Sequence, residues 1–570
     1  MLFFQTRQLT HLSPVDIIIL LLYFAVVVFI GFYVKGSTNT SEDFFLAGRE
    51  MTAWIAGLSF VSANLGSLEL MGWAGSAYQY GILATHWYWI GAIPAMLFLG
   101  IVMMPFYYIS KTHSVPGYLQ LRYGEGARGL AAASFAFMTI LMSGVNMYAM
   151  AVVMQTVLGW NINFSIWVGA ATVALYVMLG GLRSAIINEV LQFVLIWAGA
   201  ALIPILGLIE AGGWTNLKAQ IVANAGSTGY VHLWSTLGHF KDNPMGINWA
   251  GIVFGLGAII SFGYWTTDFL VVQRVLSAHN LRAAKMAPVL GAAFKMAVPF
   301  IVILPGLLAL GIMSNGHPAY HLVPTDVAIH TGQNSYDQVL PLMLIRYCGP
   351  GLLGLGITAL IAGFMSGMAG NVSAFSTVWT YDLYGAYLNK RASDSHYVFM
   401  GRASIVVGML VSIAAAYILQ HATSIMDYVQ ALFSFFIAPL YGTVLLGMLW
   451  KRATKAGGFW GLLAGTVSSI SMFIYTETGG PKALARIAFS SDAKPMAENM
   501  YRALWSWLIC VFVTVAVSYM TAPKPDSELN GLVYGATVIP HDGATTIWQK
   551  PIFWACVVAV VFVLLNIIFW

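Results

Sequence analysis

Long apolar runs follow one another along most of this chain, separated by short polar segments. Each run holds about 20 residues, the length that an α-helix needs to cross a bilayer. The pattern predicts an all-α chain of about fourteen membrane-spanning helices, over residues 15–34, 52–78, 81–109, 128–157, 162–180, 186–210, 247–273, 287–313, 339–385, 399–420, 426–450, 456–476, 500–521 and 551–569. The polar segments 211–246, 314–338, 477–499 and 522–550 are expected to be loops.

Composition and charge support a multi-pass integral membrane protein. Hydrophobic residues make up 59% of the chain and charged residues only 8%, against about 25% charged in soluble proteins. The formal net charge of +5 is spread between loops, so no nucleic-acid partner is expected. The lipid bilayer is the partner that the pattern does imply, whereas the oligomeric state is left open.

The distribution of Lys and Arg predicts the orientation. With the N-terminus outside, 17 of the 26 positive residues fall in inside loops, eight fall outside, and Lys295 lies within a span. Both termini are therefore expected outside, and the compact loops suit a bacterial cytoplasmic (inner) membrane.

The stretch VSANLGSLELMGW at 61–73 interrupts an apolar run with polar and small residues. Asn64, Gly66, Ser67 and Glu69 fall within six residues. In lipid, helix-weakening residues are tolerated only where protein or water receives the freed backbone groups, and an ionisable residue there is costly. The stretch predicts a broken helix that lines a binding site.

The spans also suggest an internal repeat. Two sets of five, 52–210 and 247–450, each begin with an interrupted helix, the second at Ser261-Phe262-Gly263. Five is odd, so the second set would be inverted, and paired interruptions of this kind indicate a transporter site between the repeats. Residues 1–570 then form a single transmembrane transporter domain, with one extra helix at 15–34 and three at 456–569.

Several residues within the spans could bind a solute. Lys295 needs a partner, either Glu69 in a structural ion pair or a polar group on a ligand. Trp87 and Tyr88 either mark the membrane interface or form an aromatic platform for a sugar face or an organic cation. Tyr264 and Trp265, beside the second interruption, invite the same two interpretations and are expected to act as a gate.

Other polar residues have equally open interpretations. Gly363 and Ser366 lie at helical spacing in the ninth span, where small residues pack helices and a hydroxyl could also coordinate Na⁺. Glu189 is either an interfacial charge near Arg183 or a waypoint for a departing cation. Interfacial ion pairs or helix caps are expected for Asp268, Arg274, Asp382 and Asp427, and inert buried thiols for Cys348, Cys510 and Cys556.

Enzyme motifs are missing from the sequence. It holds no GxxxxGK[ST] for ATP, no His/Cys/Asp metal cluster and no GxSxG. We therefore expect neither an enzyme nor an organic cofactor.

The chain resembles the sodium/solute symporters, in particular their bacterial sodium/galactose and animal sodium/glucose branch. The resemblance covers about residues 15–470 and rests on SEDFFLAGR (41–49), GGLRSAIINEVLQF (180–193), YWTTDFLVVQRVLSA (264–278), AAFKMAVPFIVILPG (292–306), TYDLYGAYL (380–388), DYVQ (427–430) and VLLGMLWKRATKAGGFWGLLAGT (444–466). It implies a leucine-transporter-type fold of 5+5 inverted repeats and alternating access driven by sodium, with Na⁺ and a small-molecule solute as ligands.

The resemblance also implies site residues. Sodium would be held by the carbonyls of Ser62, Leu65 and Gly363 and the hydroxyl of Ser366, and would leave past Glu189, where the family usually has Asp. The family's second hydroxyl is missing at Gly367, and the positions matching a second sodium site, Ala369 and Gly370, carry no oxygen, so one Na⁺ per cycle is expected. The solute would meet Asn64, Lys295, Gln430 and the inner gate Tyr264.

The solute shell departs from the galactose branch at four positions. Glu69 replaces Gln, Tyr88 an acidic ligand, Gly91 a Ser and Ser261 an Asn. The sequence thus predicts a Na⁺-coupled symporter of a small polar solute, with a sugar as the first expectation. An amino acid, a carboxylate or a quaternary amine is the alternative, and a membrane sensor or channel comes after these.

Overall fold

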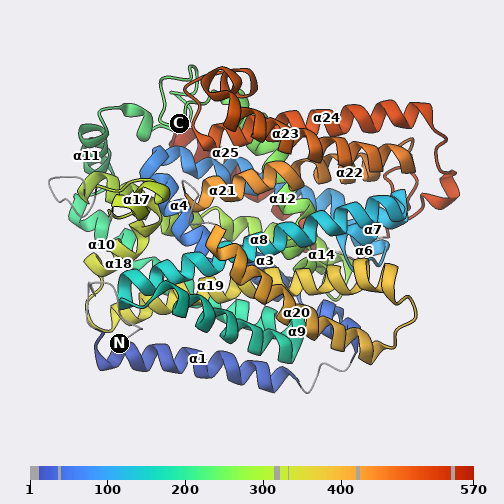
Figure 1. Cartoon of the computed structure of the whole chain (residues 1–570), viewed down its shortest axis with the longest axis horizontal. Helices are drawn as coiled ribbons and strands as arrows, with labels where there is room; N and C mark the ends of the chain where they lie inside the picture. The colour runs from blue at the N-terminus through green and yellow to red at the C-terminus, as the bar shows by residue number, and fades with distance from the viewer. Residues whose placement is uncertain are drawn as a thin grey trace.

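The computed structural model is a bundle of helices that lie side by side along the long axis of the molecule (Figure 1). It describes residues 12–35, 40–313, 321–331, 333–418, 424–540, 543 and 546–570. Within them, β-pairing is limited to two isolated bridges. Ten of the described helices are long and apolar enough to cross a bilayer, or twelve when two bent pairs each count as one span. The all-α polytopic class is confirmed.

The first half of the chain follows the predicted spans closely. Spans 162–180 and 186–210 meet in one kinked helix, because Gly181 adopts φ 55° and ψ −148° within α9. The span 81–109 is assembled from short helical pieces, including π-helical turns at Trp87–Ala92 and Leu99–Met103. The helices are α1 (Pro14–Lys35), α2 (Ser41–Leu46), α3 (Ala53–Asn64), α4 (Ser67–Tyr80), α5 (Ile93–Phe98), α6 (Met104–Ile109), α7 (Val115–Tyr123), α8 (Glu125–Leu158), α9 (Ile162–Ala200), α10 (Leu202–Ala211) and α11 (Trp214–Ala225).

The second half contains more interruptions. π-Helical segments at Gly251–Ser261, Ala309–Met313, Val378–Leu388 and Phe433–Ile437 extend the α-helices within the bundle. The α-helices are α12 (Phe262–Thr267), α13 (Phe269–Leu276), α14 (Leu281–Lys295), α15 (Val298–Val302), α16 (Leu304–Leu308), α17 (Thr325–Thr331), α18 (Val339–Tyr347), α19 (Leu352–Thr377), α20 (Asp394–Ile418), α21 (Ile425–Leu432), α22 (Ala438–Leu449), α23 (Lys455–Ala488), α24 (Pro495–Met520) and α25 (Pro551–Ile568).

Three boundaries differ from the prediction. The second interruption lies at Asp268, where the chain bends by 50° between Thr267 and Phe269, and not at 261–263. The ninth span begins at Leu352, because α18 is a separate helix that ends before Gly351, which has φ 84°. Most of the expected loop 477–499 is helical, since α23 continues to Ala488 through a kink at Gly480.

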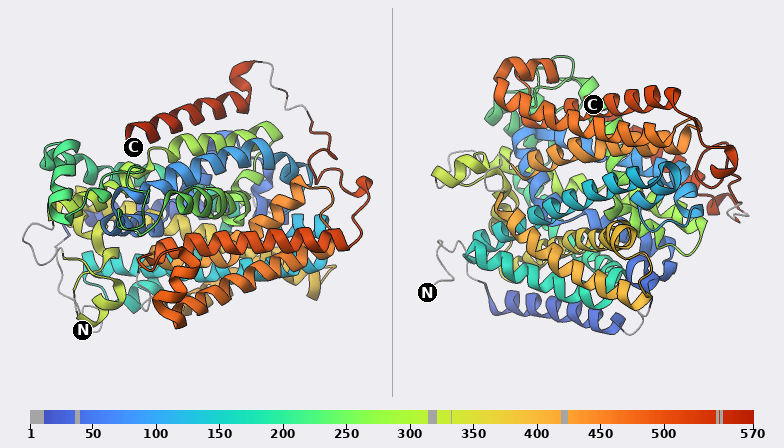
Figure 2. Two further views of the ribbon diagram at one scale, coloured as in Figure 1. Left: turned by 90° about the horizontal axis from the view of Figure 1, so that it is seen from above. Right: turned by 45° about the vertical axis from the view of Figure 1, so that its right-hand side comes forward.

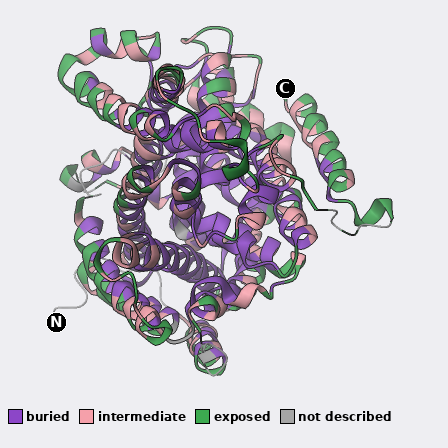
Figure 3. Cartoon of the chain, turned by 90° about the vertical axis from the view of Figure 1, so that its right-hand side faces the viewer, coloured by how far each residue is buried: buried purple, intermediate pink, exposed green. Residues whose placement is uncertain are grey.

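Burial separates a central group of helices from a lipid-facing rim (Figure 3). In α19 and the π-helical segment after it, 89% of the residues in the most apolar 18-residue stretch are buried. The corresponding share is 22% in α1 and 22% in α25. Figure 2 shows α25 lying along the outside of the bundle. The start of α1 and the end of α25 lie towards the same end of the bundle, which also carries α11, α17 and α18 (Figure 1).

The rim helix α1 is attached to the centre by a buried carboxylate. Asp16 accepts hydrogen bonds from the backbone N–H groups of Gly351, at 2.8 Å, and Gly354, at 2.6 Å, at the start of α19. An anionic acceptor at a helix N-terminus is stabilising, because it pairs with otherwise free N–H groups and the positive end of the helix dipole.

Candidate functional site

The break between α3 and α4 frees backbone groups in the middle of the bundle. Gly66 is extended, with φ −79° and ψ 176°, and its N–H donates to Asn64 O at 2.8 Å. It therefore does not donate to the carbonyl of Ser62, four residues earlier, as a continuous helix would require. That carbonyl instead accepts a hydrogen bond from Ser366 Oγ of α19 at 2.8 Å.

This break packs directly against α19. Ser62 Oγ and Ser366 Oγ lie 3.1 Å apart, and a β-carbon added to Gly66 would lie 3.4 Å from the carbonyl oxygen of Gly363. Leu65, the remaining predicted sodium residue, is buried within the break at φ −77° and ψ 53°. The structure thus gathers Ser62, Gly363 and Ser366 around one bend in the backbone, in oxygen-rich surroundings that suit a hard cation.

A cavity of about 70 Å³ lies beside this bend. All eight residues predicted to bind solute line it, namely Asn64, Glu69, Trp87, Tyr88, Ser261, Tyr264, Lys295 and Gln430. They come from the end of α3, from α4, the π-helical segment after residue 86, the second interrupted span, α14 and α21. Residues far apart in the sequence therefore meet at one place.

Lys295 is the central cation of the cavity. Its side chain is 1% exposed, and its Nζ donates to Glu69 Oε2 at 2.7 Å and also to Asn64 Oδ1. The same ammonium lies 5.0 Å from the ring centre of Tyr88 and 5.2 Å from that of Trp265. The ammonium has a carboxylate, an amide and two aromatic faces as partners, which is what a buried charge requires.

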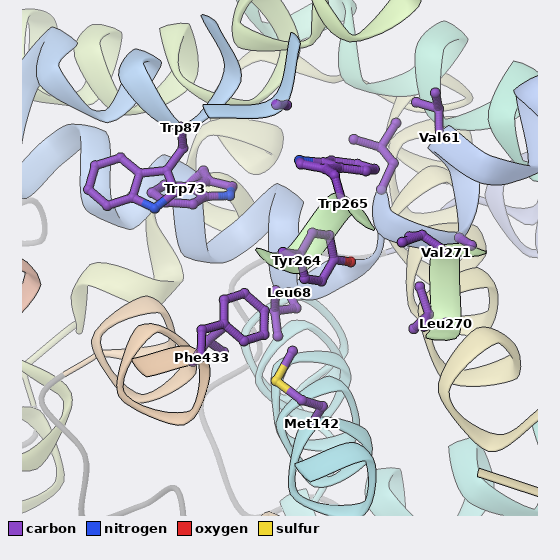
Figure 4. Packing of buried hydrophobic residues seen from close by; sticks show 14 of the residues in the cluster. Val61, Leu68, Trp73, Trp87, Met142, Tyr264, Trp265, Leu270, Val271 and Phe433 are labelled. Carbon is purple, nitrogen blue, oxygen red and sulfur yellow. The ribbon is translucent and has the colours of Figure 1, made fainter. Parts of the chain in front are cut away.

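Tyr264 closes one side of the cavity. Its hydroxyl accepts a hydrogen bond from Asn64 Nδ2 at 2.8 Å, and its ring packs 5.0 Å from Phe433 and 5.1 Å from Trp265, centre to centre. Figure 4 shows these rings, with Leu68 and Met142 close to them. The ring lines the cavity together with these apolar side chains, and its role as a gate stays a prediction.

Trp87 Nε1 and Gln430 Oε1 are among the polar atoms of the cavity wall that are free to meet a ligand. Within the described residues, neither Trp87 Nε1 nor Gln430 Oε1 has a hydrogen-bond partner, although both are buried. Buried groups of this kind are costly unless they are satisfied, so a ligand or water is the expected partner. One is a donor and the other an acceptor. Trp87 also packs 4.8 Å from Trp73, centre to centre, which gives the wall an aromatic face (Figure 4).

Glu189 does not pair with Arg183 as one of the two interpretations suggested. Arg183 pairs with Glu50 at 3.3 Å, whereas Glu189 is fully buried and pairs with Arg274 at 2.6 Å. Ser59, one turn before Ser62 on α3, donates its hydroxyl to Glu189. Glu189 is therefore a buried anion one helical turn from the predicted sodium carbonyl, not an interfacial charge.

Of the residues expected at span ends, Arg274 is instead fully buried in its pair with Glu189, whereas Asp268 and Asp382 form the expected cap and ion pair. Asp268 caps α13 through a 2.9 Å bond from Leu270 N, and Asp382 pairs with Arg128 at 2.9 Å. Cys348 and Cys510 are buried free thiols, but Cys556 on α25 is exposed on the rim, so that part of the cysteine prediction is wrong. The described residues contain no His/Cys/Asp/Glu group that could hold a metal.

Sequence reasoning did not identify several other residues of the cavity wall. Trp73 ends the stretch 61–73 that was predicted to line a site, and Trp265 was considered with Tyr264, but neither was assigned to the solute. Asn146 and Asn371 are polar residues within apolar spans, a signal that was present but not used. The wall residues that the sequence did not assign to the solute are Ala63, Gly66, Leu68, Trp73, Met142, Asn146, Ile260, Trp265, Leu270, Gly367, Asn371, Met426, Val429 and Phe433, of which Ala63, Gly66, Leu68 and Trp73 lie in the stretch 61–73 that was predicted to line a site.

Comparison with known proteins places this geometry in a family. Residues 44–465 match the sodium:solute symporter family. The chain is 28% identical to sodium/glucose cotransporter 4 of Danio rerio over 536 residues, covering 92% of this chain and 81% of the relative. It is 28% identical to sodium/glucose cotransporter 1 of Ovis aries over 543 residues, with the same coverage.

A solved structure shares the fold. The substrate-bound, outward-open state of a Na⁺-coupled sialic acid symporter aligns with a TM-score of 0.72 at 20% identity, covering 90% of this chain and 98% of that one. The likeness confirms the predicted leucine-transporter-type fold class. The division into repeats and extra helices stays a prediction.

Proposed function

Because this chain belongs to the sodium:solute symporter family, we propose that it moves Na⁺ and a neutral, polyhydroxylated solute across the membrane together. A sugar or a related polyol is the solute class that fits best. The observation that carries the proposal is that all eight predicted solute residues line one cavity, beside the oxygens of Ser62 and Ser366. Binding and movement suffice for this activity, so no covalent step and no organic cofactor enter it.

The charges of the cavity favour a neutral solute. Lys295 is matched by Glu69 at 2.7 Å, so the pair carries no net charge. A carboxylate would have to compete with Glu69 for Lys295, and a cation would have to displace Lys295 from Glu69. A sugar hydroxyl both donates and accepts, so it can bridge the two charged groups without displacing either.

The rest of the cavity wall suits the same class of ligand. The unpartnered donor of Trp87 and acceptor of Gln430 can both bond to hydroxyl groups. The Trp73–Trp87 pair offers an apolar aromatic surface for the C–H face of a sugar ring. The named relatives are sodium/glucose cotransporters, which agrees with this class. Galactose itself is not favoured, because Glu69, Tyr88, Gly91 and Ser261 differ from its known ligand shell.

Sodium would act as the cargo that stabilises the outward-open form. Carbonyl oxygens of Ser62, Leu65 and Gly363 and the hydroxyl of Ser366 would bind it, so that the ion links the α3–α4 break to α19. One Na⁺ per cycle is proposed. Solute binding beside this site would then favour closure, and the two ligands would be coupled by a shared conformational free energy.

Release of the solute and of Na⁺ would follow closure of the outer side. Movement of Tyr264 would break its 2.8 Å bond from Asn64 and open the path for the solute. Sodium would leave past Glu189 of α9, which accepts a hydrogen bond from Ser59, one turn before Ser62 on α3, and is held by Arg274. Both termini are proposed to lie outside a bacterial cytoplasmic membrane, in agreement with the distribution of Lys and Arg.

Uptake into proteoliposomes tests the sodium assignment. Ser366→Ala removes a hydroxyl ligand and is expected to raise the Na⁺ concentration for half-maximal uptake roughly tenfold, the effect of one interaction with a charge. Ser412→Ala, which removes a buried hydroxyl bonded to Gly408 O on α20, is the matched control and should leave this value unchanged. Uptake that ignores the Na⁺ gradient in the unaltered protein would refute the proposal.

Competition tests the solute class. Uptake of a radiolabelled sugar mixture is measured with an excess of unlabelled neutral sugars and polyols, amino acids, carboxylates or quaternary amines. Inhibition by the neutral class alone is expected. Inhibition by carboxylates or by quaternary amines instead would show that Lys295 or Glu69, respectively, is free to bind a charged solute.

A further inference from the structure

Asn146 on α8 carries a buried amide oxygen with no partner. The residue is 3% exposed, and its Nδ2 donates to Met142 O at 3.1 Å, which fixes the orientation of the amide. Its Oδ1 has no hydrogen-bond partner within the described residues. A buried acceptor left without a partner is destabilising, so a missing partner is expected.

This oxygen points at the edge of the proposed sodium site. A β-carbon added to Gly367 would lie 3.0 Å from Asn146 Oδ1, and one added to Gly66 would lie 3.1 Å from it. The same position on Gly66 is 3.4 Å from the carbonyl oxygen of Gly363. Asn146 Oδ1 therefore sits between the α3–α4 break and α19, in the space that a side chain at position 367 would otherwise fill.

We propose that Asn146 Oδ1 is a ligand of the transported Na⁺ and replaces the hydroxyl that residue 367 lacks. The inference rests on the proposed function. An amide oxygen is a suitable ligand for a hard cation, and it brings no charge that would have to be matched elsewhere. The third helix around the ion would then be α8, in addition to the broken α3–α4 unit and α19.

Glycine at 367 and asparagine at 146 depend on each other in this arrangement. A serine at 367 would place its β-carbon in tight contact with Asn146 Oδ1 and 3.3 Å from the α-carbon of Gly66. The two oxygens therefore compete for one place. Removing the amide should make room for the hydroxyl, which can then supply the missing ligand.

The alternative role for Asn146 is to bind the solute, because the residue also lines the cavity. An orphan oxygen alone does not decide between the two roles. Asn188 on α9 has the same local arrangement, with Nδ2 donating to Ser184 O at 3.0 Å and an unpartnered Oδ1, but it does not line the cavity. It provides a matched control.

Sodium binding without solute tests the inference. The full-length protein in detergent is titrated with NaCl at constant ionic strength, with N-methylglucamine chloride as the replacement, and the melting temperature is followed. Asn146→Ala should raise the half-saturating Na⁺ concentration roughly tenfold, and Asn188→Ala should not change it. Asn146→Asp keeps the volume and adds a negative charge, so it should lower that concentration.

A double variant gives the decisive result. Gly367→Ser alone should weaken Na⁺ binding through crowding, whereas Asn146→Ala combined with Gly367→Ser should return the half-saturating concentration to within about threefold of the unaltered protein. The inference is overturned if neither Asn146→Ala nor Asn146→Asp shifts Na⁺ binding, or if they shift only solute affinity at saturating Na⁺. If the unaltered protein and Ser366→Ala both ignore Na⁺, the proposed function fails instead.

Discussion

The Lys295–Glu69 pair offers the sharpest test of the cavity chemistry. Three variants are needed: Glu69→Gln, Lys295→Met, and the two combined. The pair is nearly dry, with side chains 1% and 7% exposed and a 2.7 Å contact. Removing one member of a buried pair leaves an unmatched charge, which typically costs about 3–5 kcal/mol.

The contacts around each member make the two single costs unequal. In Glu69→Gln the ammonium keeps Asn64 Oδ1 and the rings of Tyr88 and Trp265 at 5.0 and 5.2 Å. Cation–π contacts of this kind contribute about 1–2 kcal/mol when desolvated, so we expect a loss of about 2–3 kcal/mol. In Lys295→Met the carboxylate loses its only charged neighbour in the cavity wall, and about 3–5 kcal/mol is expected.

The double variant should cost less than the sum of the single variants. It leaves two neutral side chains of similar volume, so the coupling free energy should reach at least about 2 kcal/mol. Equilibrium unfolding in SDS–detergent mixtures measures this term. Solute uptake should stay impaired in all three variants, because the double variant restores stability but not the groups that bind hydroxyls. If the destabilisation of the double variant equals the sum of the two single-variant values to within about 0.5 kcal/mol, the pairing argument is refuted.

Two further predictions concern positions outside the cavity. Burial raises the pKa of the Asp337 carboxyl to about 6, although the Thr325 hydroxyl, which donates to Asp337 Oδ2 at 2.8 Å, lowers it in part. The folded state therefore holds this proton more tightly than the unfolded state does. The free energy of unfolding should fall by on the order of 2–3 kcal/mol as pH rises from about 4 to 6, and level off above about pH 6. In Asp337→Asn the melting temperature should no longer show this decrease, and an unchanged dependence on pH would contradict the prediction. Gly181→Ala places a β-carbon 2.5 Å from Phe44 O at φ 55° and should cost about 2–4 kcal/mol, seen as a lower melting temperature. Gly238→Ala, with open space around it, is the control, and an equal melting temperature for both would be the contrary result.

The sequence predicted the parts of this fold that depend on local chemistry. Apolar length determined the spans, and the cluster at 61–73 located the first break between Asn64 and Ser67 where the structure has it. The second break was placed several residues too early, at glycine. The bend instead occurs at Asp268, which caps the next helix, so the capping residue was a better signal than the flexible one.

The parts that could not be predicted depend on contacts between distant segments. Glu189 was weighed against Arg183, a near neighbour in sequence, but pairs with Arg274, 85 residues away. Asn146 gains its meaning only from the approach of residues 66 and 367 in space. A polar residue in an apolar span marks a candidate site residue in the sequence. Which residue it pairs with depends on how the helices pack, and the sequence alone does not show this.

Asn64 carries a consequence for how the ion gradient is conserved. One planar amide accepts from Lys295 and donates to Tyr264, so neither contact can change orientation without disturbing the other. Lys295 therefore holds the amide in place, and the amide in turn holds Tyr264. Under the proposed mechanism, a solute hydroxyl that bridges Lys295 and Glu69 would compete with Asn64 for the ammonium and so loosen the contact to Tyr264. Opening of the proposed gate would then depend on bound solute, and Na⁺ alone would not be carried down its gradient.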